Sequence, residues 1–255
     1  MTTPKVKTFQ AKGSRFYVHP ETNESVPGVT SILNTLPKPF LQYWSAKVVA
    51  EYAVDNVEQW RFLDYKAAVD LLKGAPRRYT SGRADIGSEA HDAFEKIGNG
   101  DDPGPIRVEV QPYVDQFNKF LDDFQPEFIG QELTVWSEEH RYAGSTDAFL
   151  RIQGEPVVVD WKTTKSIYPE VGLQLAAYRF ADHVIDQYGT TSPIPALNGG
   201  AVLHVREDGY DLVPLRCDEE VFEMFLSLRN FSFEWAAELS KTVVGAPIRP
   251  AALSA

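Results

Sequence analysis

Residues 142–178 read YAGSTDAFLRIQGEPVVVDWKTTKSIYPEVGLQLAAY, and they carry the most informative pattern of the chain. The segment predicts two β-strands, about 141–152 and 156–161, separated by turn residues. Asp147 lies in the first strand and Asp160 ends the second, so a hairpin can bring the two carboxylates together at the end of a sheet. Lys162 follows Asp160 by two residues, which puts both side chains on one face of an extended chain.

Two carboxylates beside a lysine suit the hydrolysis of a phosphate ester. Carboxylate oxygens are hard ligands for Mg²⁺ or Mn²⁺, and such an ion polarises a phosphoryl oxygen and acidifies a bound water. The ammonium of Lys162 can hold the water and offset the charge that develops on the phosphate. The competing interpretation is a solvated, salt-bridged strand end. The apolar run before Asp160 favours the site, because it would carry the strand end into the protein body.

Three further side chains are candidates for the same site. Gln174 and Tyr178 are four residues apart on a predicted helix and therefore share a face, where they can hold a phosphate or a lysine, or simply pack. His91 lies at the border of the apolar stripe of another predicted helix, and it can either serve the structure or supply a nitrogen ligand. Glu132, in the strand before Asp147, is a weaker additional candidate.

Four motifs occur in an order that resembles the PD-(D/E)XK nuclease superfamily, in particular its RecB-like exonucleases and the related small phage exonucleases. The matching segments are GSEAHDAFE at 87–95, GSTD at 144–147, DWK at 160–162 and QLAAY at 174–178. The segment 26–50 also resembles the N-terminal helices of the phage members. The resemblance implies an α/β fold with a PD-(D/E)XK (restriction-endonuclease-like) core, in which helices flank a central mixed β-sheet and a helical region precedes it.

The resemblance also implies roles for the site residues. His91, Asp147 and Asp160 would bind Mg²⁺ or Mn²⁺ together with the backbone carbonyl of Trp161, and Lys162 would position or activate the water. Gln174 and Tyr178 would support the lysine or touch the DNA. The implied activity is a metal-dependent DNA exonuclease that hydrolyses phosphodiester bonds in phage-type recombination, repair or replication.

Two departures from the family pattern bear on these expectations. Thr146 stands where the name-giving proline would precede Asp147, a change that the RecB-like branch tolerates. Cys217 is the single cysteine, so the four-cysteine iron–sulfur cluster of many members cannot form and no intrachain disulfide is possible.

Other functions remain open at this point. A structure-specific endonuclease of the same fold is the nearest alternative, followed by an inactive nuclease-like module that binds DNA or protein. A hydrolase with a carboxylate pair, such as a glycosidase, would need neither the metal nor the lysine. A single-strand annealing protein is a partner implied by the resemblance alone, and the oligomeric state is open.

The charge of the chain is unevenly distributed. The 255 residues carry 25 basic and 36 acidic side chains, a net charge of -11, which argues against binding nucleic acid by bulk charge. Residues 1–83 nevertheless hold 12 basic and 7 acidic side chains, against 13 and 29 in residues 84–255. We therefore expect the N-terminal third to form one wall of a DNA cleft.

Basic and aromatic side chains suggest how that wall would hold DNA. Arg77, Arg78 and Arg83 are predicted in a Gly/Pro-containing loop before the histidine helix, where they can hold phosphates or remain solvated. Lys165 would extend the track that begins at Lys162. Trp44, Trp60 and Trp161 can stack on unpaired bases, although packing in the core is the stronger interpretation for Trp44.

The organisation that we predict is one nuclease domain over residues 1–255. It comprises a basic, mostly helical region (1–83), a nuclease core (84–243) and a loose tail (244–255). Helices are predicted at 29–33, 40–56, 60–74, 84–97, 110–121, 171–188 and 219–239, and a β-hairpin at 200–215. No apolar run approaches about 18 residues, and the start lacks the apolar core of a signal peptide. We expect a cytoplasmic protein (in the host cytoplasm if a phage encodes it) without a membrane partner.

Overall fold

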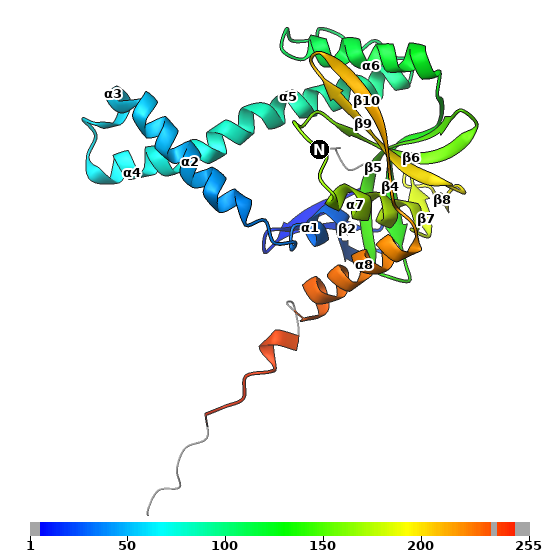
Figure 1. The fold of residues 1–255 in the computed structure, drawn as a ribbon. Coiled ribbons are helices and arrows are strands. Elements are labelled where there is room, and N and C mark those ends of the chain that lie inside the picture. Colours follow the sequence, from blue (N-terminus) through cyan, green and yellow to red (C-terminus); the bar gives the residue numbers. More distant parts are fainter. Residues whose placement is uncertain (1–5, 236–238, 248–255) are drawn as a thin grey trace, which may run out of the picture.

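The computed structural model describes residues 6–235 and 239–247 and shows an α/β architecture (Figure 1). Its main sheet has seven strands in the order β10-β9-β6-β5-β4-β7-β8. The sheet is mixed, because β6 and β9 run parallel whereas the other neighbours are antiparallel. The strands are β4 (Glu127–Ser137), β5 (Tyr142–Ile152), β6 (Glu155–Lys162), β7 (His183–Ile185), β8 (Thr191–Pro193), β9 (Gly199–Arg206) and β10 (Gly209–Leu215).

Helices cover both faces of this sheet. On one face α1 (Val29–Leu33), α7 (Glu170–Arg179) and α8 (Glu219–Asn230) pack on a core that includes Phe149 and Val158. On the other face α5 (Ala75–Gly98) and α6 (Gln111–Phe124) pack on Leu150, Val159 and Trp161. The side chains of a strand alternate between two sides, so β5 and β6 contribute to both cores and the sheet is buried on both faces.

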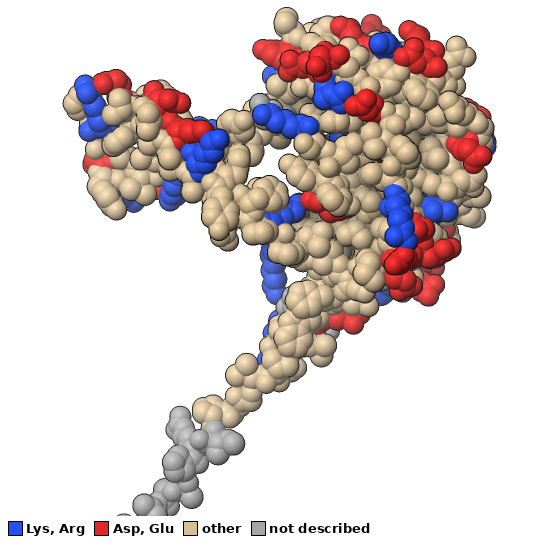
Figure 2. All heavy atoms as spheres, in the orientation of Figure 1, with Lys and Arg blue, Asp and Glu red and all other residues tan. Residues whose placement is uncertain are grey.

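A helical arm stands away from the sheet. It consists of α2 (Phe40–Asp55), α3 (Val57–Trp60), α4 (Tyr65–Lys73) and the first turns of α5, which runs on from the arm to the body (Figure 1). Lys and Arg atoms are interspersed with Asp and Glu atoms on the arm, and Lys and Arg atoms also border the gap between arm and body, whereas further Asp and Glu atoms form clusters on the outer parts of the body (Figure 2).

The N-terminal residues form a small separate sheet. Its antiparallel strands are β1 (Thr8–Ala11), β2 (Ser14–Val18) and β3 (Ser25–Pro27). Tyr17 and Val26 pack with Trp136 and Ile185 of the main sheet, so this segment is tied to the body. Among the described residues, no helix has the length and apolar character needed to cross a membrane.

Most predicted elements are confirmed, and the differences have local causes. The predicted helix 84–97 begins at Ala75 instead, because Pro76 is tolerated in a first helical turn and the glycines that follow do not break the helix. The predicted helix 171–188 ends at Arg179, because the next residues pair with β4 as the short strand β7.

Two further boundaries differ from the prediction. The predicted helix 60–74 is divided into α3 and α4, and Asp64 caps α4 by accepting a hydrogen bond from the backbone of Ala67. The predicted helix 219–239 is α-helical to Asn230 and continues as a π-helical turn, Phe231–Trp235 (η1). A 3₁₀ turn, Leu239–Lys241 (η2), follows, and of the predicted tail, residues 248–255 lie outside the described residues.

Candidate active site

Asp147 and Asp160 lie where β5 and β6 separate. The paired register of the two strands runs from Ile152 and Glu155 to Ala148 and Val159. Beyond that point β6 continues beside β9, and the backbone N–H of Trp161 donates a hydrogen bond of 2.7 Å to Oδ2 of Asp147. A carboxylate thus replaces the neighbouring strand's backbone as acceptor, which explains how an acidic side chain only 3% exposed is accommodated here.

Asp160 is held from two sides. Its Oδ2 lies 2.5 Å from Nζ of Lys162, and its Oδ1 accepts a hydrogen bond of 2.8 Å from Nε2 of Gln174. Gln174 also donates to the hydroxyl of Tyr178 at 3.1 Å, because residues four apart on α7 lie on one face. The fold therefore brings the D-x-K strand and the α7 pair together.

Tyr178 reaches the site because Gly144 leaves space for its ring. A Cβ atom at Gly144 would lie 2.6 Å from Cε1 of Tyr178, a distance that the packed core could not accommodate without movement. Burial raises the pKa of the Tyr178 hydroxyl well above its usual value, and the nearby Asp160 and Asp147 raise it further. The phenol therefore stays protonated and serves as a hydrogen-bonding group.

His91 approaches the same carboxylates from α5. Its Nδ1 lies 3.3 Å from Oδ1 of Asp147, and within the described residues this nitrogen makes no hydrogen bond. Gly87, one turn earlier, allows the approach, since a Cβ there would lie 3.1 Å from Oγ1 of Thr163. The contact between an imidazole nitrogen and a carboxylate oxygen is favourable when the two atoms share a cation, either a proton or a metal ion.

Burial dominates the electrostatics of the carboxylate pair. It raises the pKa of Asp160, and Asp147 adds to the rise, although Lys162 and His91 oppose it. Burial by itself would lower the pKa of Lys162, but Asp160, Asp147 and Glu170 outweigh it and the pKa is raised. The ammonium form of the lysine is thus favoured, and a further cation, either a proton or a metal ion, would relieve the repulsion between the two buried acids.

The donor set has the chemistry of a hard divalent cation, with two buried carboxylates and one imidazole. As placed, however, no group of three or more His, Cys, Asp or Glu side chains among the described residues could hold a metal ion. The reason is visible in the contacts, because Lys162 and Gln174 occupy the oxygens of Asp160. Binding of Mg²⁺ or Mn²⁺ would require the Lys162–Asp160 ion pair to open.

Glu132 lies next to this constellation on β4. Its neighbours Gln131 and Leu133 pair with Ala148 and Thr146, so Glu132 lies across from Asp147. It is buried, its φ is +51°, and such strain is often found near functional sites. Its side chain lines a separate hollow of about 250 Å³, which does not include Lys162 or Gln174.

The predicted arginine loop is wrong. Arg77 and Arg78 lie in the first turns of α5, within the arm, because the helix begins at Ala75. Arg78 donates a hydrogen bond to the carbonyl of Leu71 at 2.7 Å and lies over the ring of Tyr52 at 4.8 Å. The backbone of Arg83 belongs to the same helix, and its side chain lies outside the described residues.

The remaining predicted contacts have mixed outcomes. Lys165 is exposed in the loop after β6, close to Lys162 in the chain. The indole of Trp161 is only 1% exposed and lies edge-on to Phe117 at 5.4 Å. Stacking of Trp161 on a base is therefore excluded. Side chains alternate along a strand, so Trp161, between Asp160 and Lys162, faces the side of β6 opposite to the site.

His204 is a further residue next to the site. It is buried on β9 and pairs in register with Lys162. Its Nε2 lies 2.6 Å from the carbonyl oxygen of Thr164, and its Nδ1 lies 3.0 Å from Nη1 of Arg206. A carbonyl only accepts and a guanidinium only donates, so His204 donates through Nε2 and anchors the loop that follows Lys162.

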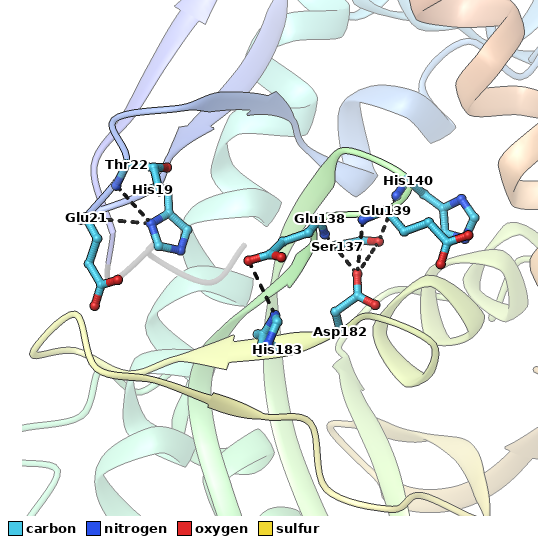
Figure 3. A network of polar contacts seen from close by, with 9 residues as sticks. All are labelled: His19, Glu21, Thr22, Ser137, Glu138, Glu139, His140, Asp182 and His183. Carbon is cyan, nitrogen blue, oxygen red and sulfur yellow. Dashed lines mark hydrogen bonds and ion pairs between the residues drawn. The ribbon is translucent and has the colours of Figure 1, made fainter.

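His140 and His183 lie at the far end of β4 and β5. Asp182 accepts hydrogen bonds from the hydroxyl of Ser137 at 2.9 Å and the backbone of Glu138 at 2.8 Å (Figure 3). His140 donates from its backbone to the same Ser137, and the ring of His183 lies 3.9 Å from Glu138. This network closes the turn between the two strands, a structural role.

Comparisons with known proteins add little. No protein-family model and no curated protein matches the sequence. Solved structures do match, 17 chains in all, and among them is one titled "Crystal structure of SSO0001". It is 15% identical, the match covers 49% of this chain and 58% of that chain, and the TM-score is 0.29. The match thus spans little more than half of that structure, and a TM-score of 0.29 is too low to indicate a shared fold.

Proposed function

We propose that the protein is a metal-dependent DNA nuclease with a PD-(D/E)XK core, and an exonuclease in particular. The observation that carries the proposal is the convergence of His91, Asp147, Asp160 and Lys162 at the point where β5 and β6 separate. His91 on α5 comes from a segment far in the sequence from the consecutive strands β5 and β6, which carry the other three residues. Their convergence supports a chemical role over a salt-bridged strand end in solvent, since both acids are buried.

The chain's own groups have defined tasks under this proposal. Asp147, Asp160 and His91 would hold Mg²⁺ or Mn²⁺, with the carbonyl of Trp161 as the further ligand that the family resemblance implies. The chemistry that such an ion supplies when bound is polarisation of a phosphoryl oxygen and acidification of a bound water. Gln174 and the backbone N–H of Trp161 orient the two carboxylates.

Lys162 would act on the phosphate directly. Its ammonium is held charged by the neighbouring carboxylates, and once released from Asp160 it can hold the attacking water and stabilise the charge that develops on the phosphate oxygens. Tyr178, protonated and bonded to Gln174, keeps that amide directed at Asp160. The arm and the body would flank the DNA, with the basic side chains of the arm on one side.

Degradation of end-labelled linear DNA in Mg²⁺ or Mn²⁺ tests the proposal. Lys162→Ala should lower the rate by roughly 10²–10³-fold, the usual cost of removing one group that stabilises transition-state charge. Lys119→Ala, an exposed lysine on α6, is the matched control and should retain full activity. Wild-type protein no more active than Lys162→Ala would refute the proposal, as would activity that survives EDTA.

The same assay separates the alternatives. An exonuclease spares covalently closed circular DNA, whereas a structure-specific endonuclease opens a circle that contains its target structure. Tight DNA binding without cleavage in either metal would indicate an inactive nuclease-like module.

A further inference from the structure

A hollow of about 190 Å³ opens beside Lys162 and Gln174. One side is formed by Thr30 and Asn34 at α1, and the other by Thr164 and Ser166 in the loop after β6. Hydroxyl and amide groups on both sides can donate to and accept from a polar ligand. The hollow is thus a continuation of the candidate active site, directed toward the base of the arm.

The hollow combines an apolar floor with positive charge. Leu33, Ile167 and Val171 line it and offer contact to a flat apolar group. Two ammonium groups line it as well, and each is paired with a carboxylate: Nζ of Lys162 lies 2.5 Å from Oδ2 of Asp160, and Nζ of Lys38 lies 3.3 Å from Oε1 of Glu170, which also lines the hollow. A ligand that is part aromatic and part anionic fits this lining where its anionic group replaces a carboxylate as the partner of a lysine.

Two aromatic rings stand at the border of this hollow. Tyr168, which lines it, stacks on Phe40 at the start of α2 with the ring centroids 6.2 Å apart and the planes 8° from parallel. The two residues remain 45% and 51% exposed. Each ring packs on the other and keeps an exposed surface, and exposed aromatic surface beside lysines is the arrangement on which unpaired bases stack.

We propose that the hollow receives one unpaired nucleotide of a DNA strand, with its base against Tyr168 and Phe40 and its phosphates toward Lys38 and Lys162. The volume of about 190 Å³ is below the roughly 300–1,000 Å³ of sites for drug-sized ligands, so the hollow excludes a base pair and takes only part of one nucleotide, whose base would lie at the exposed border. The substrate class would then be single-stranded or frayed ends, and not intact duplex. This inference rests on the proposed nuclease function for its biological meaning.

Binding without cleavage tests the hollow separately from the chemistry. The probe is a single-stranded oligonucleotide with a terminal 2-aminopurine, in EDTA, followed by base fluorescence and by anisotropy. Tyr168→Ala should weaken binding by about 5- to 100-fold, the usual cost of removing one stacking partner, and abolish the quenching. Tyr168→Phe, which keeps the ring, should restore both. Tyr188→Ala, which changes an aromatic residue 84% exposed in the turn between β7 and β8 of the body, should behave as wild type.

The outcomes separate the two proposals. Equal affinity of wild type and Tyr168→Ala for the single strand would overturn the nucleotide site, as would a preference for a blunt, GC-clamped duplex or no binding to any oligonucleotide. If the wild-type protein shows no metal-dependent cleavage but quenches 2-aminopurine fluorescence in a way that depends on Tyr168, the nuclease proposal would be refuted and the nucleotide site would stand. Thermal melting of each variant shows whether it is folded.

Discussion

The body and the arm of this molecule are stabilised in opposite ways. The body buries large side chains completely, among them Phe117, Phe149 and Trp161, each at most 1% exposed. The arm helices α2, α3 and α4, all of whose residues the structure describes, bury only Val48, and they expose Phe62 and Tyr65 by 79% and 87%. Burial of apolar surface is the main source of stability. The arm helices bury little of it and therefore depend on their contacts with α5 for stability, whereas the buried cores on both faces of the sheet stabilise the body.

This contrast has a functional side. The candidate site lies in the body, where strands and packed helices hold the carboxylates in place. The proposed nucleotide site lies at the junction, beside the stacked rings of Tyr168 in the body and Phe40 in the arm. Precise chemistry suits a rigid region, and substrate capture suits a region of lower stability.

The largest expected effect contrasts buried with exposed phenylalanine. Phe117→Ala should lower the free energy of unfolding by about 3–5 kcal/mol, because it leaves a cavity between Phe94 and Trp161. Phe62→Ala in the arm should change it by no more than about 0.5 kcal/mol. Urea denaturation measures both. Similar values for the two variants would mean that the arm is covered in solution.

A glycine pair gives opposite signs for the two regions. Gly144→Ala should destabilise by about 1–3 kcal/mol, because the added methyl group overpacks the core against Tyr178. Gly82→Ala, in the arm part of α5 with no atom within 4 Å, should stabilise by up to about 1 kcal/mol through helix propensity. Thermal melting gives the signs directly, and a destabilising Gly82→Ala would contradict an uncovered arm.

His204 tests the rigidity of the loop beside Lys162. His204→Leu removes the donor to the carbonyl of Thr164, so it should lower the cleavage rate by about tenfold, a cost of roughly 1.4 kcal/mol for one buried hydrogen bond, with little change in KM. His204→Gln, which keeps an N–H donor, should recover part of the rate. His183→Leu, at the far turn, is the control. An equal loss in both leucine variants would indicate general destabilisation.

The smallest effect concerns the charges of the arm. Replacing Arg77, Arg78 and Arg83 together by alanine should weaken DNA binding by several-fold. It should also flatten the plot of log binding constant against log salt concentration, by about 0.9 in slope for each phosphate that these arginines neutralise. Arg78→Ala alone controls for the removal of its interactions with Leu71 and Tyr52. Binding titrations across a salt series check this, and an unchanged slope would remove the arm from the DNA path.

Much of the fold was predictable because its signals are local. Alternating and apolar runs marked β4, β5 and β6, and the hairpin predicted at 200–215 is formed by β9 and β10. The start of α5 was missed because a proline and glycines can also form a loop. The strand β7 was missed because His183–Ile185 is extended only through its pairing with β4, a contact between segments far apart in the sequence.

The same division applies to the candidate site. Asp147, Asp160 and Lys162 could be predicted from their strand positions, and Gln174 and Tyr178 from their helical spacing. Nothing local distinguishes His204, Tyr168 or Phe40 from ordinary packing or surface residues. Their roles arise from neighbours that other segments supply, namely the carbonyl of Thr164 and each other's rings.

The sequence by itself determined the alternation of elements, the charge split at residue 83 and the chemistry of the acidic pair, because these depend on residue type and spacing along one segment. The tertiary structure decided where β5 and β6 separate, that Gln174 donates to Asp160, and that a hollow lies at the base of an exposed arm. The physical reason is that burial, ion pairing and cavities depend on side chains from several segments, which only the folded chain brings together.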